Sequence, residues 1–222
     1  MAASTLPIFP LPLVLFPGVT IPLHIFEPRY RRMLADCLER DRRFGIVFLA
    51  EGTSEDSLGI GGDVGCIAHV LSHDLLPDGR SNITVAGRER FTLRAFVTSP
   101  LPYHIGMVVP LEDTAEPGAL LEPLATRVRE RFERIARAAR TISDDDDAIP
   151  ELPDDPALLA FRVASFIDLN IAERQRLLGS TSPGERLRTV DNVLAPAVDP
   201  MEQRAVTHTR AKTNGHGGVA HL

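Results

Sequence analysis

The residues that could carry out chemistry are few and far apart. Cys66, His69 and His73 have the side-chain types of a metal site, in the pattern C-x2-H-x3-H. On an extended strand, a rise of about 3.3 Å per residue would place His69 and His73 roughly 13 Å apart, with Cys66 facing away from His69. One metal ion cannot join residues in that arrangement. We therefore expect no metal and no cofactor.

Covalent catalysis also lacks its usual residues. Lys212 is the only lysine, so Schiff-base chemistry, a Ser-Lys dyad and a phosphate-binding lysine have no candidate before that position. The chain contains no G-x-S-x-G motif, and GIGGDVG at 59–65 departs from the dinucleotide-binding pattern. Asp144–Asp147 lack the alternating spacing and the glycine of a calcium loop. The sequence predicts that the chain is not an enzyme.

Composition indicates a soluble globular protein of one large or two small domains. The 222 residues are 44% hydrophobic and 24% charged, and 30 acidic residues against 24 Lys and Arg give a net charge of -6. This balance disfavours nucleic acid as a partner, although Arg127, Arg131 and Arg134 could form a local basic stripe on a helix. Glu130 stands four positions before Arg134 and could neutralise part of that stripe.

Two features predict a location in the cytoplasm. Cys37 and Cys66 are the only cysteines, too few for a disulfide framework, and free thiols suit a reducing compartment. The apolar residues 6–19 are interrupted by four prolines, and no Lys or Arg precedes Arg29. This start of the chain predicts neither a signal peptide nor a membrane helix, so we expect no membrane partner.

The first half of the chain is expected to form strands around one helix. Short apolar runs broken by proline or glycine are typical of edge strands and sheet corners. Pro28 opens a pattern with apolar residues every three or four positions, as far as Leu38, which predicts a helix. The expected strands are 6–9, 13–16, 20–25, 44–50, 64–71, 82–97 and 103–109. Six or seven short strands, a hairpin turn at 77–79 and one helix predict a small, closed or nearly closed β-barrel.

From Pro117 onward the apolar period becomes helical. The expected helices cover 121–142, 157–169, 170–179 and a segment that begins at 182. Asn170 and Ser182 begin two of them with the spacing of a capping box. We predict three parts: a β-barrel subdomain at 1–115, a helical bundle subdomain at 116–200 and a flexible tail at 201–222.

Several segments resemble one protein family. Phe16-Pro17-Gly18 and the segment P-L-H-I-F-E-P-R-Y at 22–30 are similar to the opening of the Lon protease N-terminal domain. Gly65–Ala68, Asp78–Phe91 and Asp168–Leu178 resemble later segments of the same family. The resemblance extends over about residues 6–195. It implies a PUA-like β-barrel with one inserted helix, followed by an α-helical bundle, in agreement with the α+β class that the periodicity predicts.

The resemblance also implies a function. In the Lon family this domain recognises unfolded or damaged protein segments, while ATPase and protease activity require a phosphate-binding loop and a Ser-Lys dyad, for which this chain offers no residues. We expect a stand-alone, non-catalytic module that binds exposed apolar segments of unfolded or target proteins. Two alternatives stay open: an adaptor or regulator of a separate ATP-dependent protease, and an RNA-binding PUA-like protein.

Candidate binding residues lie at proline-rich strand ends, which we expect to border a cleft between the barrel and the bundle. The candidates for peptide contact are Leu11, Leu13, Tyr103 and His104. A second set belongs to the family signature, and we expect its polar members to tie the strands to the helix through hydrogen bonds and a charge pair. Its members are Phe16, Pro17, Gly18, His24, Glu27, Arg29 and Tyr30.

Overall fold

The computed structural model describes residues 3–59, 62–145 and 148–215. The chain forms two compact units. Residues 1–114 and 164–181 make up the first, here called the strand unit, and residues 115–163 and 182–222 make up the second, the helical unit. This division differs from the predicted boundaries. Residues 164–181 were expected in the bundle but belong to the strand unit, and residues after 200 were expected as a separate tail but belong to the helical unit.

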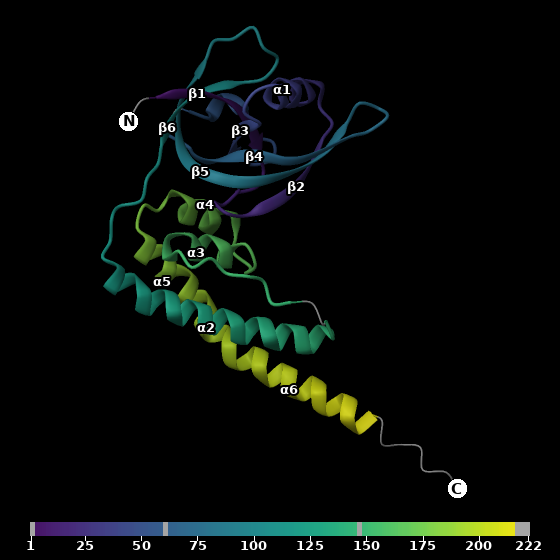
Figure 1. Cartoon of the computed structure of the whole chain (residues 1–222), viewed down its shortest axis with the longest axis vertical. Helices are drawn as coiled ribbons and strands as arrows, with labels where there is room; N and C mark the ends of the chain where they lie inside the picture. The colour runs from purple at the N-terminus through teal and green to yellow at the C-terminus, as the bar shows by residue number, and fades with distance from the viewer. Residues whose placement is uncertain (1–2, 60–61, 146–147, 216–222) are drawn as a thin grey trace. The chain divides into compact units, whose positions relative to one another are not determined.

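Six strands form one sheet in the strand unit. They are β1 (Ser4–Leu11), β2 (Thr20–Ile25), β3 (Arg43–Phe48), β4 (Val64–Leu75), β5 (Ser81–Val97) and β6 (Ile105–Pro110). Their order is β2-β5-β4-β3-β1-β6, and β5 also pairs with β6. The 17 residues of β5 allow it to pair with β2, β4 and β6 along its length (Figure 1). The pairings from β5 through β4, β3, β1 and β6 thus lead back to β5.

One predicted strand is wrong. Residues 13–16 form no strand and instead lead into a turn, in which Gly18 has a φ of 73°. The Gly18 N–H donates to the carbonyl of Gly87 at 3.0 Å, and the Gly87 N–H donates to the carbonyl of Val19 at 2.8 Å. The apolar run is therefore explained by burial of a turn against β5 rather than by ladder pairing.

The predicted helix is present as α1 (Pro28–Leu38), with Pro28 in its first turn and one buried face. The short 3-10 helix η1 (Glu55–Ser57) follows in the loop between β3 and β4. Leu58, directly after η1, is buried in the interior cluster of the strand unit. The other buried members of that cluster are Leu6, Ile8, Val47, Phe91, Leu93 and Val108. The loop is thus fixed to the core through an apolar side chain.

Helices make up the second unit. They are α2 (Gly118–Ser143), α3 (Pro156–Ala164), α5 (Pro183–Leu194), the 3-10 helix η2 (Ala195–Ala197) and α6 (Val198–Gly215). The last residue of α3, Ala164, belongs to the strand unit, as does the whole of α4 (Ile171–Gly179). Helix α3 ends five residues before its predicted end at residue 169. None of the helices within the described residues combines the length and the hydropathy that a bilayer crossing requires.

The predicted flexible tail is wrong for residues 201–215, which continue α6. Ala205 is buried, Glu202 accepts two hydrogen bonds of 2.8 Å from Arg134 of α2, and Lys212 forms an ion pair with Asp144 at the end of α2. These contacts hold a polar segment as a helix. Residues 216–222 of the predicted tail lie outside the described residues.

Candidate functional site

Three of the residues singled out in the sequence, Arg29, Tyr30 and His104, meet at one carboxylate, that of Glu55. The Arg29 guanidinium donates to Glu55 Oε2 at 3.0 Å and to Oε1 at 2.7 Å, and its Nε donates to Glu27 at 3.0 Å. The Tyr30 hydroxyl donates to Glu55 Oε1 at 3.3 Å, and His104 Nε2 lies 2.7 Å from Oε2. This network joins the start of α1, the η1 loop and the segment before β6.

The charges in this network compensate one another. Partial burial acts to raise the pKa of Glu55, but the hydrogen bonds and charges of Arg29 and then of His104 outweigh it and hold that pKa below its ordinary value. Burial, followed by the charge of Glu55, raises the pKa of the Tyr30 hydroxyl. The His104 ring stacks on Phe96 with 4.4 Å between ring centroids. The arrangement suits a structural tie better than proton transfer.

Sequence reasoning missed Glu55. It lies in a polar, glycine-rich loop, EGTSEDSLGIGGD at 51–63, and its partner Arg29 is 26 positions away. No local spacing links the two residues. The only available signal was that Arg29 and His104 both needed an acidic partner if they were to be partly buried.

The predicted peptide-contact residues do not gather into one site. Tyr103 is buried, and its hydroxyl donates to Asp36 at 2.8 Å, while His104 is held in the Glu55 network. Leu11 ends β1 and Leu13 follows it in a bend, both half-buried. Peptide contact by these four residues stays a prediction.

His24 lies apart from the Glu55 network, on β2. Its Nδ1 is 2.7 Å from Asn82 Oδ1 on β5, and its ring stacks on Phe26 at 6.0 Å. A groove of about 330 Å³ runs beside these side chains, and we call it the β2 groove. Its lining includes Pro22, His24, Ser72, Asp74, Asn82 and Thr84. The groove is shallow, mixed in polarity and accessible.

Apolar side chains stand exposed around the same strands. Phe26, just after β2, is 58% exposed, and Leu71 and Leu75 on β4 are 49% and 68% exposed. The register places Ile25 and Leu75 on either side of Ser81, so Phe26 and Leu75 lie at the same end of the sheet. We call Phe26, Leu71 and Leu75 the hairpin patch. Exposed apolar side chains commonly mark an interaction surface where they form a contiguous patch.

The candidate nucleophiles are buried. Burial raises the pKa of the Cys37 thiol and of the Cys66 thiol to about 12, so both stay protonated and unreactive near neutral pH. His73 Nε2 lies 3.0 Å from Ser81 Oγ, but Ser81 is only 4% exposed and a substrate cannot reach it. Among the residues that the structure describes, no group of three or more His, Cys, Asp or Glu could hold a metal ion.

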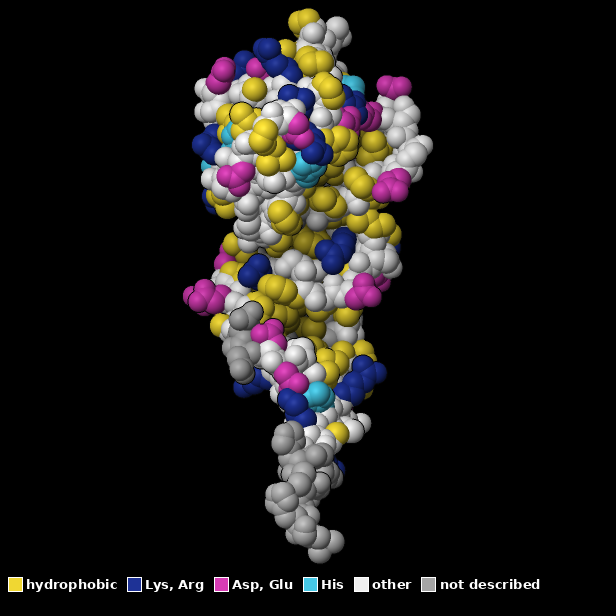
Figure 2. Space-filling view, turned by 90° about the vertical axis from the view of Figure 1, so that its right-hand side faces the viewer, with side chains coloured by type: hydrophobic (Ala, Val, Ile, Leu, Met, Phe, Trp, Pro, Cys, Tyr) yellow, Lys and Arg dark blue, Asp and Glu magenta, His cyan; other side chains and the backbone are white. Residues whose placement is uncertain are grey.

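The arginine stripe of α2 is partly neutralised by acids of the same unit. Arg127 Nε donates to Asp191 of α5 at 2.8 Å, Arg131 pairs with the same carboxylate, and Arg134 pairs with Glu202 of α6. On the face shown in Figure 2, Lys and Arg side chains lie among Asp and Glu side chains. Pairing with carboxylates weakens the attraction of these arginines for phosphates.

Comparison with known proteins points to one family. The chain matches the model of the ATP-dependent protease La (LON) substrate-binding domain over residues 5–195. Lon protease 2 of Herpetosiphon aurantiacus is 30% identical over 208 residues, which are 90% of this chain and 25% of that protein. Lon protease of Xanthomonas oryzae pv. oryzae is 28% identical over 211 residues, or 94% of this chain and 25% of that protein. The chain thus spans about a quarter of the length of these curated relatives.

Two solved structures share the fold. The Lon N-terminal domain protein from Xanthomonas campestris is 25% identical, with a TM-score of 0.58 over 84% of this chain and 96% of that one. The N-terminal domain of the Mycobacterium avium complex Lon protease has a TM-score of 0.63 at 17% identity, over 86% of this chain and 98% of that one. Because the family model covers most of the sequence, the chain belongs to the LON substrate-binding domain family.

Proposed function

We propose that this chain is a non-catalytic binding module that engages exposed apolar segments of unfolded or target proteins at β2 and the hairpin patch. One observation carries the proposal: β2 is the edge strand of the sheet, the exposed Phe26 directly follows it, and the exposed Leu75 of β4 lies at the same end of the sheet, with β5 between β2 and β4. The family description, which names substrate binding, supports it.

The edge of β2 suits an extended ligand. In the described sheet β2 is the terminal strand and pairs with β5 alone, so its other side presents main-chain groups that no strand of the sheet takes up. Pro22 lies within β2, and proline is tolerated in edge strands because it lacks an N–H. An extended segment can add to such an edge through main-chain hydrogen bonds and place side chains in the adjacent β2 groove.

The hairpin patch would supply the preference for apolar segments. Folded proteins bury most of their large apolar side chains, whereas unfolded ones expose them along extended stretches. Contact with Phe26 and Leu75 removes apolar surface of both partners from water, at roughly 25 cal/mol per Å². A folded protein whose apolar side chains are buried cannot make that contact, so its binding free energy lacks this contribution.

The proposal also includes a fold type for each unit and a location of the protein in the cell. We interpret the circuit of pairings from β5 through β4, β3, β1 and β6 as a small β-barrel of the PUA-like kind. We interpret helices α2, α3, α5 and α6 as a helical bundle, which differs from the predicted bundle at 116–200 by lacking α4 and including α6. The free, buried thiols of Cys37 and Cys66 suit the cytoplasm that we propose.

A binding assay with one protein in two states tests this function. We expect fluorescently labelled, reduced and alkylated α-lactalbumin, which cannot refold, to bind the chain, and native α-lactalbumin to bind at least about tenfold more weakly. The chain should leave the unfolded protein uncleaved during the assay. Equal affinity for the two forms, or no binding of either, would contradict the proposal.

A second candidate is an adaptor or regulator of a separate ATP-dependent protease. It is favoured by the names of the relatives, which are Lon proteases matched over about a quarter of their length. An affinity pull-down with quantitative mass spectrometry separates the two functions. A general binder should retrieve many proteins in small amounts, and an adaptor should retrieve one protease at near-equal stoichiometry.

A further inference from the structure

A cavity of about 500 Å³ lies where the first half of β1 and the start of β6 face the end of α1. We call it the β1–β6 cavity, and it shares no lining residue with the β2 groove. Its apolar lining includes Leu6, Ile67, Ile105 and Val108. Leu6 and Val108 also belong to the interior cluster, so the cavity reaches the core.

Strand pairing explains why this space is open. Residues 8–11 of β1 pair in parallel with β3, whereas residues 4–7 pair with β6 on their other side. The first half of β1 therefore has no partner on the side that faces β3 in the described sheet. The C-terminal end of α1 and the residues after it, Asp36 to Asp41, border the gap.

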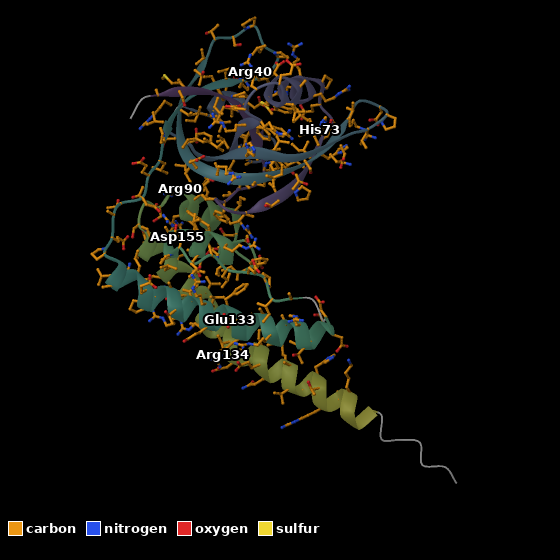
Figure 3. The ribbon with its side chains drawn as sticks, viewed as in Figure 1. Arg40, His73, Arg90, Glu133, Arg134 and Asp155 are labelled. Carbon is orange, nitrogen blue, oxygen red and sulfur yellow. The ribbon has the colours of Figure 1, made fainter. Side chains whose placement is uncertain are left out.

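The acids at the rim of the cavity are already paired. Asp36 accepts hydrogen bonds from the Tyr103 hydroxyl at 2.8 Å and from Arg32, and Asp41 accepts one from Arg43 Nε at 2.9 Å. Arg40, labelled beside α1 in Figure 3, is exposed at the same rim. Among the described residues it has no ion pair with a carboxylate. Among the described lining residues, Arg40 is thus a cation that forms no ion pair, although its charge also acts on Asp36.

We propose that the β1–β6 cavity binds a carboxylate that carries one apolar group, with the apolar group on the Leu6, Ile67 and Val108 floor and the carboxylate at Arg40. A pocket of this volume, with apolar side chains on its floor and polar and charged ones along its rim, can hold a small ligand that has both an apolar and a charged part. The carboxylate can be the free C-terminus of a polypeptide that ends in an apolar residue, or a small organic acid. The site is separate from the binding surface proposed above.

Methyl NMR spectra of the whole chain test this site with two acids and a neutral control. N-acetyl-L-leucine mimics a polypeptide C-terminus, 4-methylpentanoate mimics a small organic acid, and N-acetyl-L-leucinamide lacks the charge. We expect N-acetyl-L-leucine to shift the methyl signals of Leu6, Ile67 and Val108 with a Kd on the order of 1 mM, as its size allows. The amide should bind at least about fivefold more weakly. Binding of both acids indicates a general carboxylate site, and binding of N-acetyl-L-leucine alone indicates a peptide-end site.

Two variants and a charge-matched control decide the role of Arg40. Arg40→Gln should weaken N-acetyl-L-leucine binding about fivefold and leave the amide unaffected, while Arg88→Gln, an exposed arginine of β5, should change neither. Ile105→Trp should fill the cavity and abolish the shifts. The proposal is overturned if the cavity methyl signals do not move at roughly 20 mM acid, if acid and amide bind alike, or if Arg40→Gln behaves as Arg88→Gln does.

Discussion

Arg29 and Glu55 are joined by two hydrogen bonds of 3.0 and 2.7 Å, although they lie 26 positions apart in the chain. Such bidentate pairing fixes the orientation of the carboxylate, and His104 accordingly finds Glu55 Oε2 at 2.7 Å. Leu58, three residues beyond Glu55, is buried in the interior cluster. The η1 loop is therefore held at two points, one polar and one apolar.

Glu55→Gln should lower the free energy of unfolding by about 1–2 kcal/mol at pH 7, because Arg29 and His104 lose a charged acceptor in a partly buried setting. Urea denaturation measures the change. Glu51→Gln, an exposed position in the same loop, removes the same charge and should change stability by less than about 0.5 kcal/mol. Equal losses in the two variants would show that the network contributes nothing specific.

The contribution of Glu55 should depend on pH in a defined direction. Its pKa in the folded chain lies below the ordinary value of 4.5, so its stabilisation is present above the unfolded-state pKa of about 4.3 and is lost as the pH falls through the folded-state pKa. The stability difference between the wild type and Glu55→Gln should therefore shrink as the pH falls below about 4.3. Urea midpoints across a pH series measure it. A difference that grows as the pH falls below about 4.3 would contradict the lowered pKa of Glu55.

Arg90→Gln should destabilise the strand unit by about 3 kcal/mol, because a buried charge network loses its centre. Arg90, labelled in Figure 3, is 5% exposed and donates to the carbonyls of Leu178 and Ser180, each at 2.6 Å, and to Asp113. Denaturant unfolding should show the loss. Arg88 is exposed and lies two residues away on β5, so Arg88→Gln should have a stability near that of the wild type. A comparable loss of stability in Arg88→Gln would refute the role of Arg90 as the centre of a buried network.

Arg90→Lys is a sharper test of geometry. It keeps the charge but lacks the planar fork that reaches two carbonyls and a carboxylate together. We expect it to recover less than about half of the stability that Arg90→Gln loses. Full recovery would mean that charge alone matters at this position.

Gly87→Ala should cost about 2 kcal/mol or more, since a Cβ at this position would lie 2.1 Å from the carbonyl oxygen of Phe16. That oxygen belongs to the backbone of the turn docked on β5, so it cannot swing away. Thermal unfolding measures the effect. Gly118→Ala is the matched control, because nothing lies within 4 Å of a Cβ added at this position. Since the residue is helical, alanine there should raise the free energy of unfolding by up to about 1 kcal/mol. Similar melting temperatures for the two variants would contradict the close-approach argument.

Sequence patterns correctly predicted the elements that depend on residues close together in the chain. The helix at 28–38 was predicted from end to end, because Pro28 suits a first helical turn and the apolar residues follow a helical period. The capping box at Asn170 is also present, with Glu173 N–H donating to Asn170 at 2.9 Å and Glu173 accepting from the Asn170 N–H at 3.0 Å. Residues within a few positions of one another determine both features.

Features that depend on distant partners could not be predicted in this way. The segment 13–16 has the apolar character of a strand but is buried as a turn against Gly87. Helix α6 has the composition of a tail and becomes ordered through ion pairs with α2. In the candidate site, Glu55 and the exposure of Phe26 follow from tertiary packing, which no periodicity in the sequence encodes.

The most direct test of the account compares two double variants in the unfolded α-lactalbumin assay. Phe26→Ser with Leu75→Ser removes the centre of the hairpin patch, and Leu120→Ser with Val206→Ser removes exposed apolar side chains from α2 and α6. We predict that the first pair weakens binding at least about tenfold and the second by less than about twofold, with both proteins fully folded by circular dichroism. Unchanged affinity in a folded Phe26→Ser, Leu75→Ser protein would contradict the claim that this surface binds clients.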